Sequence, residues 1–400
     1  MLLSPGRDTA VSHSHLKLRG ELFFRALSAM GYHLFVPGEL DLKVGSETLQ
    51  ELSRSLGVAA VQLNVYRNGE RVFAGYREIE KSGMNVLVTG VIAEEFIQKE
   101  YREWSGYEVR DPRHELEKLL GERNKDADLL IIVSHLPHRT ERKLALAFPF
   151  PALFLSVHSG YFHKPAVLGK SIIVSLPDRG RYIGKLTLRG ERGDTPAVLR
   201  YVLDPTGETA EKGRTRNDVK KAPVEERISS GEGRAESGVP EISVRFEKIL
   251  LGEAIPEDGG MESLLRDYRE KIGKLQYDSG SDGNYVGASH CKKCHPERVE
   301  HWLAGSHSRA YETLITRREE MNPDCLICHT TGFGRGGYRP RAPRGQKLEG
   351  VGCEECHGPG KGHPDGKLSI PEEKDCRQCH NREDIWNYSG ARKKIGCDKE

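Results

Sequence analysis

The residues of this 400-residue chain most suited to chemistry are its nine cysteines, none of which lies before residue 291. Eight of them form four C-x-x-C pairs, and a histidine directly follows each pair. The four motifs are Cys291–Cys294–His295, Cys325–Cys328–His329, Cys353–Cys356–His357 and Cys376–Cys379–His380. C-x-x-C-H is the attachment sequence of c-type haem, whose vinyl groups bind the two cysteines while the histidine ligates iron. The sequence therefore predicts four covalently bound haem c groups, each with the histidine of its motif as proximal ligand.

Two other uses of paired cysteines fit less well. Zinc ribbons also contain C-x-x-C pairs, but zinc does not require a histidine directly after each second cysteine. A thioredoxin-like redox pair needs a strand–helix–strand setting, which the cysteine-rich segment does not suggest. Haem attachment is therefore the interpretation that we retain.

Four further histidines of the segment are candidates for the second axial position of an electron-transfer haem. His307 and His363 are the first candidates for distal ligands, and His301 and His290 are the remaining ones. The alternative for His301 is a surface position, and for His290 a structural or exposed role.

The sequence around His307 predicts one helix over residues 297–318, broken only by Gly305. His301 and His307 would then lie about 240° apart around the helix and could not serve the same haem face. Trp302 and Tyr311 flank His307 and are predicted to pack against porphyrin.

The elements that precede these motifs indicate an α/β fold. Residues 1 to about 190 alternate apolar runs with helical patterns. The predicted strands are 85–88, 129–133 and 171–174, and the predicted helices are 21–30, 46–56 and 115–120. A late strand is predicted at 241–251 and a helix at 262–275.

Changes in composition predict the domain boundaries. Residues 1–204 together with 241–276 form the predicted α/β domain, and residues 205–240, rich in glycine and charged groups, a disordered or long surface loop. Residues 277–284 form a linker. From residue 285 to 400 the periodicity nearly vanishes, which predicts a mostly α-helical and irregular domain with a non-protein core.

Charge and hydropathy exclude some function classes. Sixty-one basic and 59 acidic residues give a net charge of +2, which argues against a dedicated nucleic-acid binder. The mean hydropathy is −0.58, and no apolar run reaches the roughly 18 residues that a membrane helix needs, so no transmembrane segment is predicted. Met1–Pro5 lacks the features of a secretory signal, so we expect the natural start to differ.

The cysteine-rich segment resembles the cytochrome c-554 type of multihaem cytochromes. The resemblance covers about residues 284–390 and rests on Tyr285–Cys291, on His301–Trp302 with His307, and on Cys353 to Gly360. It implies closely stacked haems, mostly with two histidine ligands, in the periplasm, and supports His307 and His363 as distal ligands. Members of this group can keep one haem five-coordinate.

Residues 1 to about 275 resemble a shortened 5′-nucleotidase-type metallophosphoesterase. The matching segments are 31–41, 128–135, 157–163 and 180–184. The family's chemistry needs two metal ions that activate a water molecule for attack on phosphate. His135 is the metal ligand that matches cleanly, whereas His158 and His163 have the wrong spacing. The resemblance therefore implies an incomplete, metallophosphoesterase-like layered sandwich without a working dimetal site.

Together these features predict an extracytoplasmic, periplasmic electron carrier fused to a degenerate phosphoesterase scaffold, with no catalytic residues of its own. The expected partners are redox proteins, either other cytochromes or a quinol/oxidoreductase complex; the sequence indicates no oligomeric state. One alternative is a metal-dependent phosphoesterase with an attached cytochrome. Another is a multihaem reductase that binds its substrate at an open haem iron.

Overall fold

The computed structural model describes residues 13–97, 106–123, 127–157, 165–175, 182–190, 198–201, 241–252, 255–275, 284–341, 348–363, 365, 371–372, 375–376 and 378–380. These residues form two compact units. The first lies within residues 27–257, and the second combines residues up to 26 with residues from 258 onward. The predicted loop 205–240, His158 and His163 lie outside the described residues.

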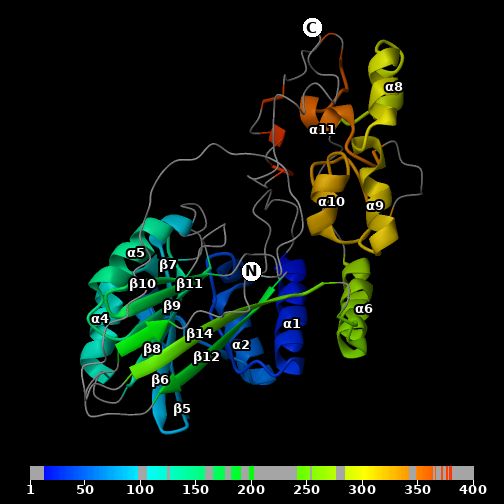
Figure 1. Ribbon diagram of the computed structural model, residues 1–400. Helices are drawn as coiled ribbons and strands as arrows, with labels where there is room; N and C mark the ends of the chain where they lie inside the picture. The colour runs from blue at the N-terminus through cyan, green and yellow to red at the C-terminus, as the bar shows by residue number, and fades with distance from the viewer. Residues whose placement is uncertain are drawn as a thin grey trace. The chain divides into compact units, whose positions relative to one another are not determined.

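A six-stranded mixed sheet forms the centre of the first unit (Figure 1), with the strand order β10-β11-β9-β8-β6-β5. Its strands are β5 (Arg77–Lys81), β6 (Met84–Ile92), β8 (Leu129–His135), β9 (Ala152–Ser156), β10 (Ala166–Leu168) and β11 (Ser171–Ser175). The four inner strands are parallel, and β5 and β10 pair antiparallel at the edges. Parallel strands are buried on both faces, which explains why β6, β8 and β11 could be predicted from continuous apolar runs.

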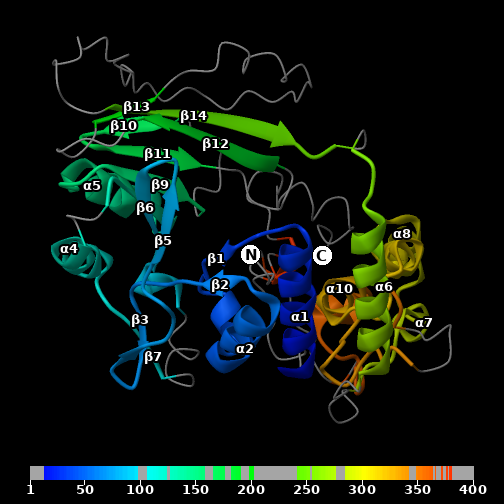
Figure 2. The ribbon, with the colours of Figure 1, turned by 90° about the horizontal axis from the view of Figure 1, so that it is seen from below.

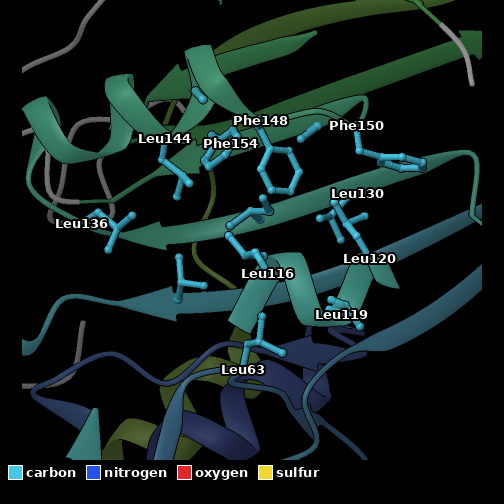
Figure 3. Close-up of a cluster of buried hydrophobic side chains, with 14 of the residues drawn as sticks. Leu63, Leu116, Leu119, Leu120, Leu130, Leu136, Leu144, Phe148, Phe150 and Phe154 are labelled. Carbon is cyan, nitrogen blue, oxygen red and sulfur yellow. The ribbon is translucent and has the colours of Figure 1, made fainter. Parts of the chain in front are cut away.

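Both faces of this sheet are covered, so the unit has three layers (Figure 2). On one face, α4 (Pro112–Arg123) and α5 (His138–Ala147) pack on side chains such as Leu130 and Phe154. Figure 3 shows this cluster, with Leu116 and Leu144 supplied by the helices. On the other face lies a three-stranded sheet of β12 (Tyr182–Gly190), β14 (Glu241–Leu250) and β13 (Val198–Tyr201). The predicted α/β class is confirmed.

Shorter elements complete the first unit. They are β1 (Leu34–Phe35), η2 (Asp41–Val44), α2 (Ser46–Leu56), β2 (Ala59–Ala60), β3 (Val65–Arg67), β4 (Glu70–Arg71), η3 (Glu94–Phe96) and β7 (Tyr107–Val109). The helix predicted at 46–56 is confirmed as α2, and the one predicted at 115–120 lies inside α4.

The second unit is built from short helices and irregular segments. Its elements are α1 (His13–Ala29, up to residue 26), α6 (Gly259–Lys274), α7 (Ala288–Cys291), α8 (Pro296–Ala304), η4 (His307–Arg309), α9 (Ala310–Arg317), α10 (Pro323–His329) and α11 (Cys353–His357). The helix predicted at 262–275 corresponds to α6, which begins after Asp258, whose side chain accepts a hydrogen bond from Met261 N. No helix in the described part of the chain is both long and apolar enough to span a bilayer.

Polar contacts join α1 to α6 and to α10, the helix that carries the second haem motif, and join α6 to the turn before α10. His15 Nε2 and Tyr268 Oη lie 2.9 Å apart, and Arg19 forms an ion pair of 2.5 Å with Asp324 in α10. Arg269 of α6 binds Glu319 at 2.9 Å. Figure 2 shows the three helices side by side. The domain boundaries predicted from sequence place α1 and α6 in the first domain, and these boundaries stay a prediction. By their packing, α6 and the part of α1 up to residue 26 belong to the second unit.

Candidate haem-binding site

Each of the four cysteine motifs contains one turn of helix. The second and third motifs lie inside α10 and α11. In the first motif His295 N donates to Cys291 O, and in the fourth His380 N donates to Cys376 O, both at 2.9 Å. Positions i, i+3 and i+4 of such a turn lie on one face, so both thiols and the imidazole of a motif are presented together. This is the local geometry that attachment of a haem requires.

Two of the motif histidines face a second histidine from elsewhere in the sequence. The ring centroids of His295 and His363 lie 6.2 Å apart, and those of His380 and His307 lie 5.9 Å apart. Two imidazoles on opposite sides of one metal ion have centroids about 6 Å apart, because each metal–nitrogen bond is about 2 Å and the ring centre lies about 1 Å behind the nitrogen. The separations of both pairs match this distance.

The position of His307 is fixed by backbone contacts with the segment before the third motif. Val351 N donates to His307 O at 2.9 Å, and Trp302 Nε1 donates to Val351 O at 2.8 Å. Gly350 has φ +82°, and a side chain there would lie 2.6 Å from Ser308 O. The close approach that holds His307 therefore requires glycine at position 350.

The single helix predicted over residues 297–318 is wrong in part. The break at Gly305 is present, but it separates α8 from a one-turn 3₁₀ helix, η4, in which His307 is the first residue. Gly305 has an extended ψ of 170°, so His301 and His307 do not share one helix axis. Tyr311 packs on Tyr338, with ring centroids 5.3 Å apart, and Trp302 anchors Val351.

His363 lies in a turn that is tied to the first motif. His363 N donates to Gly360 O at 3.1 Å, and Lys361 N donates to Asn284 O at 3.0 Å. These bonds bring the chain after the third motif back to the chain before the first one. The other two histidine candidates, His301 in α8 and His290 in α7, have exposed side chains, and their roles as ligands stay predictions.

The imidazole of His329 is oriented by its Nδ1 atom. This nitrogen lies 2.8 Å from Ala310 O and 3.2 Å from Thr313 Oγ1. Histidines that bind metals usually donate their second ring N–H to a carbonyl or carboxylate oxygen, which fixes the tautomer. The contact with Ala310 therefore leaves Nε2 of His329 as the nitrogen available for a metal.

Two buried carboxylates of the third motif were missed by sequence reasoning. Glu354 and Glu355 stand between Cys353 and Cys356, with exposed fractions of 2% and 9%. Glu355 accepts from Gly332 N at 2.8 Å and forms an ion pair of 2.5 Å with Arg335. The sequence signal for them was the pair of adjacent glutamates between the two cysteines of the motif. Carboxylates are rarely buried without partners, so burial of this pair requires specific hydrogen-bond or ion-pair partners.

Among the described residues, the hydrogen-bond partners of Glu354 are backbone groups. Its carboxylate accepts hydrogen bonds from Val286 N at 2.8 Å, Gly287 N at 2.7 Å and Gly360 N at 2.7 Å. The three donors come from both sides of the cysteine motifs, so one side chain joins the segment before the first motif to the turn before His363.

In the first unit, His135 lies where the metallophosphoesterase resemblance places a metal ligand. It ends β8, and its Nδ1 lies 3.4 Å from Glu39 Oε2. A side chain at Gly38 would lie 2.4 Å from the His135 ring, so this approach requires glycine. Asp41 nearby is buried and accepts from Gly38 N at 2.8 Å; burial raises the pKa of its carboxyl group. Among the described residues no group of three or more His, Cys, Asp or Glu is placed to hold a metal ion.

Comparison with known proteins separates the two halves of the chain. Residues 290–358 match the family model described as cytochrome c554 and c-prime. The C-terminal part of the chain contains a cytochrome c554-type domain. Over 97 residues, the chain is 34% identical to cytochrome c-554 of Nitrosomonas europaea, a match that covers 20% of this chain and 41% of that protein.

The N-terminal region matches 5′-nucleotidases. Identity to the 5′-nucleotidase of Vibrio vulnificus is 28%, across 68% of this chain and 50% of that protein. A structural comparison with the calcineurin-like phosphoesterase YfkN of Bacillus subtilis gives a TM-score of 0.45 at 12% identity, over 64% of this chain and 75% of that one. The chain thus spans about half or less of the curated relatives named here.

Partial burial changes the pKa of two thiols of the cytochrome domain, those of Cys325 and Cys353. Burial, followed by the charges of Glu319 and Asp324, raises the pKa of Cys325 to about 12, and burial raises the pKa of Cys353 to about 11. Cys291 and Cys353 each influence the pKa of the other thiol. The first and third motifs of the cytochrome domain are therefore neighbours in space.

The paired histidines of the cytochrome domain favour the neutral imidazole. Burial, followed by the charge of His380, lowers the pKa of His307, and burial lowers the pKa of His380. A histidine must be neutral to bind a metal ion. At neutral pH both rings of this pair are therefore in the form that a haem iron requires.

Proposed function

We propose that this chain is a four-haem electron-transfer protein that acts outside the cytoplasm, with a first unit that serves as a phosphoesterase-like scaffold without hydrolytic activity. Four haem c groups are attached through the eight motif cysteines, and His295, His329, His357 and His380 are their proximal ligands. His363 is the distal ligand opposite His295, and His307 is the distal ligand opposite His380. His301 and His290 remain candidates for the other two irons.

The observation that carries the proposal is the pairing of motif histidines with non-motif histidines. Centroid separations of 6.2 and 5.9 Å fit one metal ion between each pair. Zinc held by the cysteines would not require these opposed imidazoles. The pairing also involves His363 and His307, which lie 68 and 73 residues along the chain from the histidines they face, so it follows from the fold and not from local sequence.

When bound, haem supplies reversible one-electron oxidation and reduction of its iron. The protein's own residues attach the haems and position their ligands. The thiols would attach each haem and the paired imidazoles would ligate its iron, while the contacts of Val351 and Gly360 set the positions of His307 and His363. The proposed partners are other redox proteins, which donate and accept the electrons.

A hydrolase is the second candidate, because 28% identity to a 5′-nucleotidase extends over much of the chain. The residues around His135 do not favour it. Glu39 and Asp41 stand beside this histidine, and Pro37–Gly38–Glu39 replaces the Gly-Asn-His-Glu turn of the family that the first unit resembles. Too few of the family's ligands are present to bind two metal ions.

The proposal is tested by mass spectrometry and a redox titration of the mature protein. We expect a mass excess of four haems that survives acid-acetone extraction, and low-spin ferric signals that titrate in one-electron steps. Zinc in place of iron, or extractable haem, would overturn the proposal. A high-spin ferric haem that binds carbon monoxide when reduced would favour the reductase alternative.

A further inference from the structure

The third haem motif carries a buried negative charge that no cation offsets among the residues that the structure describes. Glu355 is neutralised by Arg335 at 2.5 Å. Within the described part of the chain no lysine, arginine or histidine lies within ion-pairing distance of Glu354, whose three partners are backbone N–H groups. The motif therefore has a net charge of about −1 that is fixed in place and 2% exposed.

This charge lies next to the attachment points of two haems. Glu354 directly follows Cys353, and it accepts a hydrogen bond from the backbone N–H of Gly287, whose carbonyl oxygen accepts from the Cys291 thiol of the first motif at 3.8 Å. The field of Glu354 reaches both sulfur atoms: after burial, it is the next cause that raises the pKa of Cys291, and it also contributes to the raised pKa of Cys353.

A ferric haem iron carries one more positive charge than a ferrous one. A fixed anion nearby therefore stabilises the ferric state and lowers the reduction potential, and burial limits the screening by water and salt. Second-shell charges and hydrogen bonds are established means by which a protein tunes haem.

We propose that Glu354 lowers the reduction potentials of the haems on the third and first motifs, and that the third motif therefore carries the lowest potential of the four. This inference rests on the proposed function, because it requires haem at those motifs. Glu354 acts as a positioning residue as well, since it binds Gly360 in the turn before His363.

The test compares reduction potentials in four-haem protein. In Glu354→Gln, one potential should rise by at least about 59 mV, a tenfold change in the ferric-to-ferrous ratio for one electron. A second potential should rise by less, and the other two should stay unchanged. The EPR signal of the haem on the first motif should remain low-spin, which shows that His363 is still in place.

Two matched controls separate the buried charge from other effects. The double variant Glu355→Gln/Arg335→Gln removes the ion pair between Glu355 of the same motif and Arg335, and leaves the net charge unchanged. The variant Glu297→Gln removes one charge from an exposed site in α8. Neither should change any potential tenfold. Four attached haems with unchanged potentials in Glu354→Gln, or equal shifts of all four, would overturn the inference.

A further pair of variants keeps the test decisive if Glu354→Gln does not acquire haem. Glu354→Asp keeps the charge and should keep the low potential. Cys353→Ser/Cys356→Ser removes the third haem and should remove the lowest-potential step; loss of any other step would overturn the inference. A wild-type protein without haem would instead refute the proposed function.

Discussion

The two units bring titratable side chains together in different ways. In the cytochrome domain, each of two histidines faces a second histidine from a distant segment at about 6 Å, and turns and backbone hydrogen bonds fix both positions. In the first unit, His135 at the end of a β-strand contacts Glu39 at 3.4 Å, and no metal-binding cluster forms among the described residues. The second unit holds pairs of imidazoles at a separation that matches two ligands of one metal ion, whereas the first unit fills its interior with its own side chains.

This difference predicts which unit depends on a cofactor. The buried cluster of the cytochrome domain is small and consists of Leu314, Leu326, Ile327, Phe333 and Tyr338. The first unit has two large clusters, one on each face of its sheet. Burial of apolar surface is the main favourable contribution to folding, so the cytochrome domain must obtain much of it from haem.

The largest effect is therefore expected when haem attachment is prevented. With all eight motif cysteines changed to serine, the segment 284–380 should lose its cooperative fold, at a cost of about 5 kcal/mol or more, while the first unit keeps its melting transition. Hydrogen exchange followed by mass spectrometry measures both units in one sample. Native-like protection of α10 and α11 in the haem-free protein would contradict this.

Loss of one distal ligand should affect one haem of four. We expect His307→Ala to convert one haem from low to high spin, to raise its potential and to admit carbon monoxide, because the thioethers and His380 still hold the haem. His301→Ala, at an exposed site of α8, serves as the control and should have a smaller effect. Unchanged low-spin signals in His307→Ala, together with a lost signal in His301→Ala, would show that the ligands are assigned wrongly.

The contact between α1 and α6 should make the second unit sensitive to acid. Burial, followed by the charge of Arg19, lowers the pKa of His15 to about 3. Because the unfolded chain binds a proton below about pH 6.5 and the folded one does not, stability falls as the pH drops from 6.5 towards 3. Between pH 7 and pH 5 this single group should cost about 2 kcal/mol.

Urea unfolding of the haem-loaded protein at both pH values measures this effect. In His15→Gln the loss between pH 7 and pH 5 should shrink by about 2 kcal/mol, whereas His33→Gln, at an exposed site, should behave like the wild type. An unchanged pH dependence in His15→Gln would show that His15 is not buried in the neutral form.

The smallest effect is expected for His135. Nucleotide hydrolysis with added Mn²⁺ or Zn²⁺ should stay at background in the wild-type protein, and His135→Ala should change nothing. A 5′-nucleotidase assayed in parallel confirms that the conditions support turnover. Robust hydrolysis that His135→Ala abolishes would refute the scaffold role of the first unit.

The parts of the fold that could be predicted from sequence are those that local pattern determines. Apolar runs predicted β6, β8 and β11, because strands buried on both faces exclude polar side chains. The C-x-x-C-H spacing identified the four motifs, and the structure forms a helical turn in each of them. His307 and His363 were chosen as distal ligands partly from local residues, and the structure places both beside motif histidines; their ligation of iron stays a proposal.

The features that could not be predicted depend on contacts between distant segments. The local pattern predicted one helix over residues 297–318 with a break at Gly305, but Val351 binds the backbone at His307 and favours a 3₁₀ turn there. The local sequence around Glu354 is that of a solvent-exposed residue. Its side chain is buried because the fold brings the backbone donors of Val286 and Gly360 to it. Nothing in the residues around Arg19 indicates that Asp324 will be its partner.

The ion pair between Arg19 and Asp324 also has a consequence for the order of events during synthesis. The two residues are 305 positions apart (324 − 19), so at a translation rate of about 5–20 residues per second the ribosome adds Asp324 roughly 15–60 seconds after Arg19. Tyr268, the partner of His15, is also made long after α1. Helix α1 can therefore reach these contacts only after the start of the second haem motif has been made.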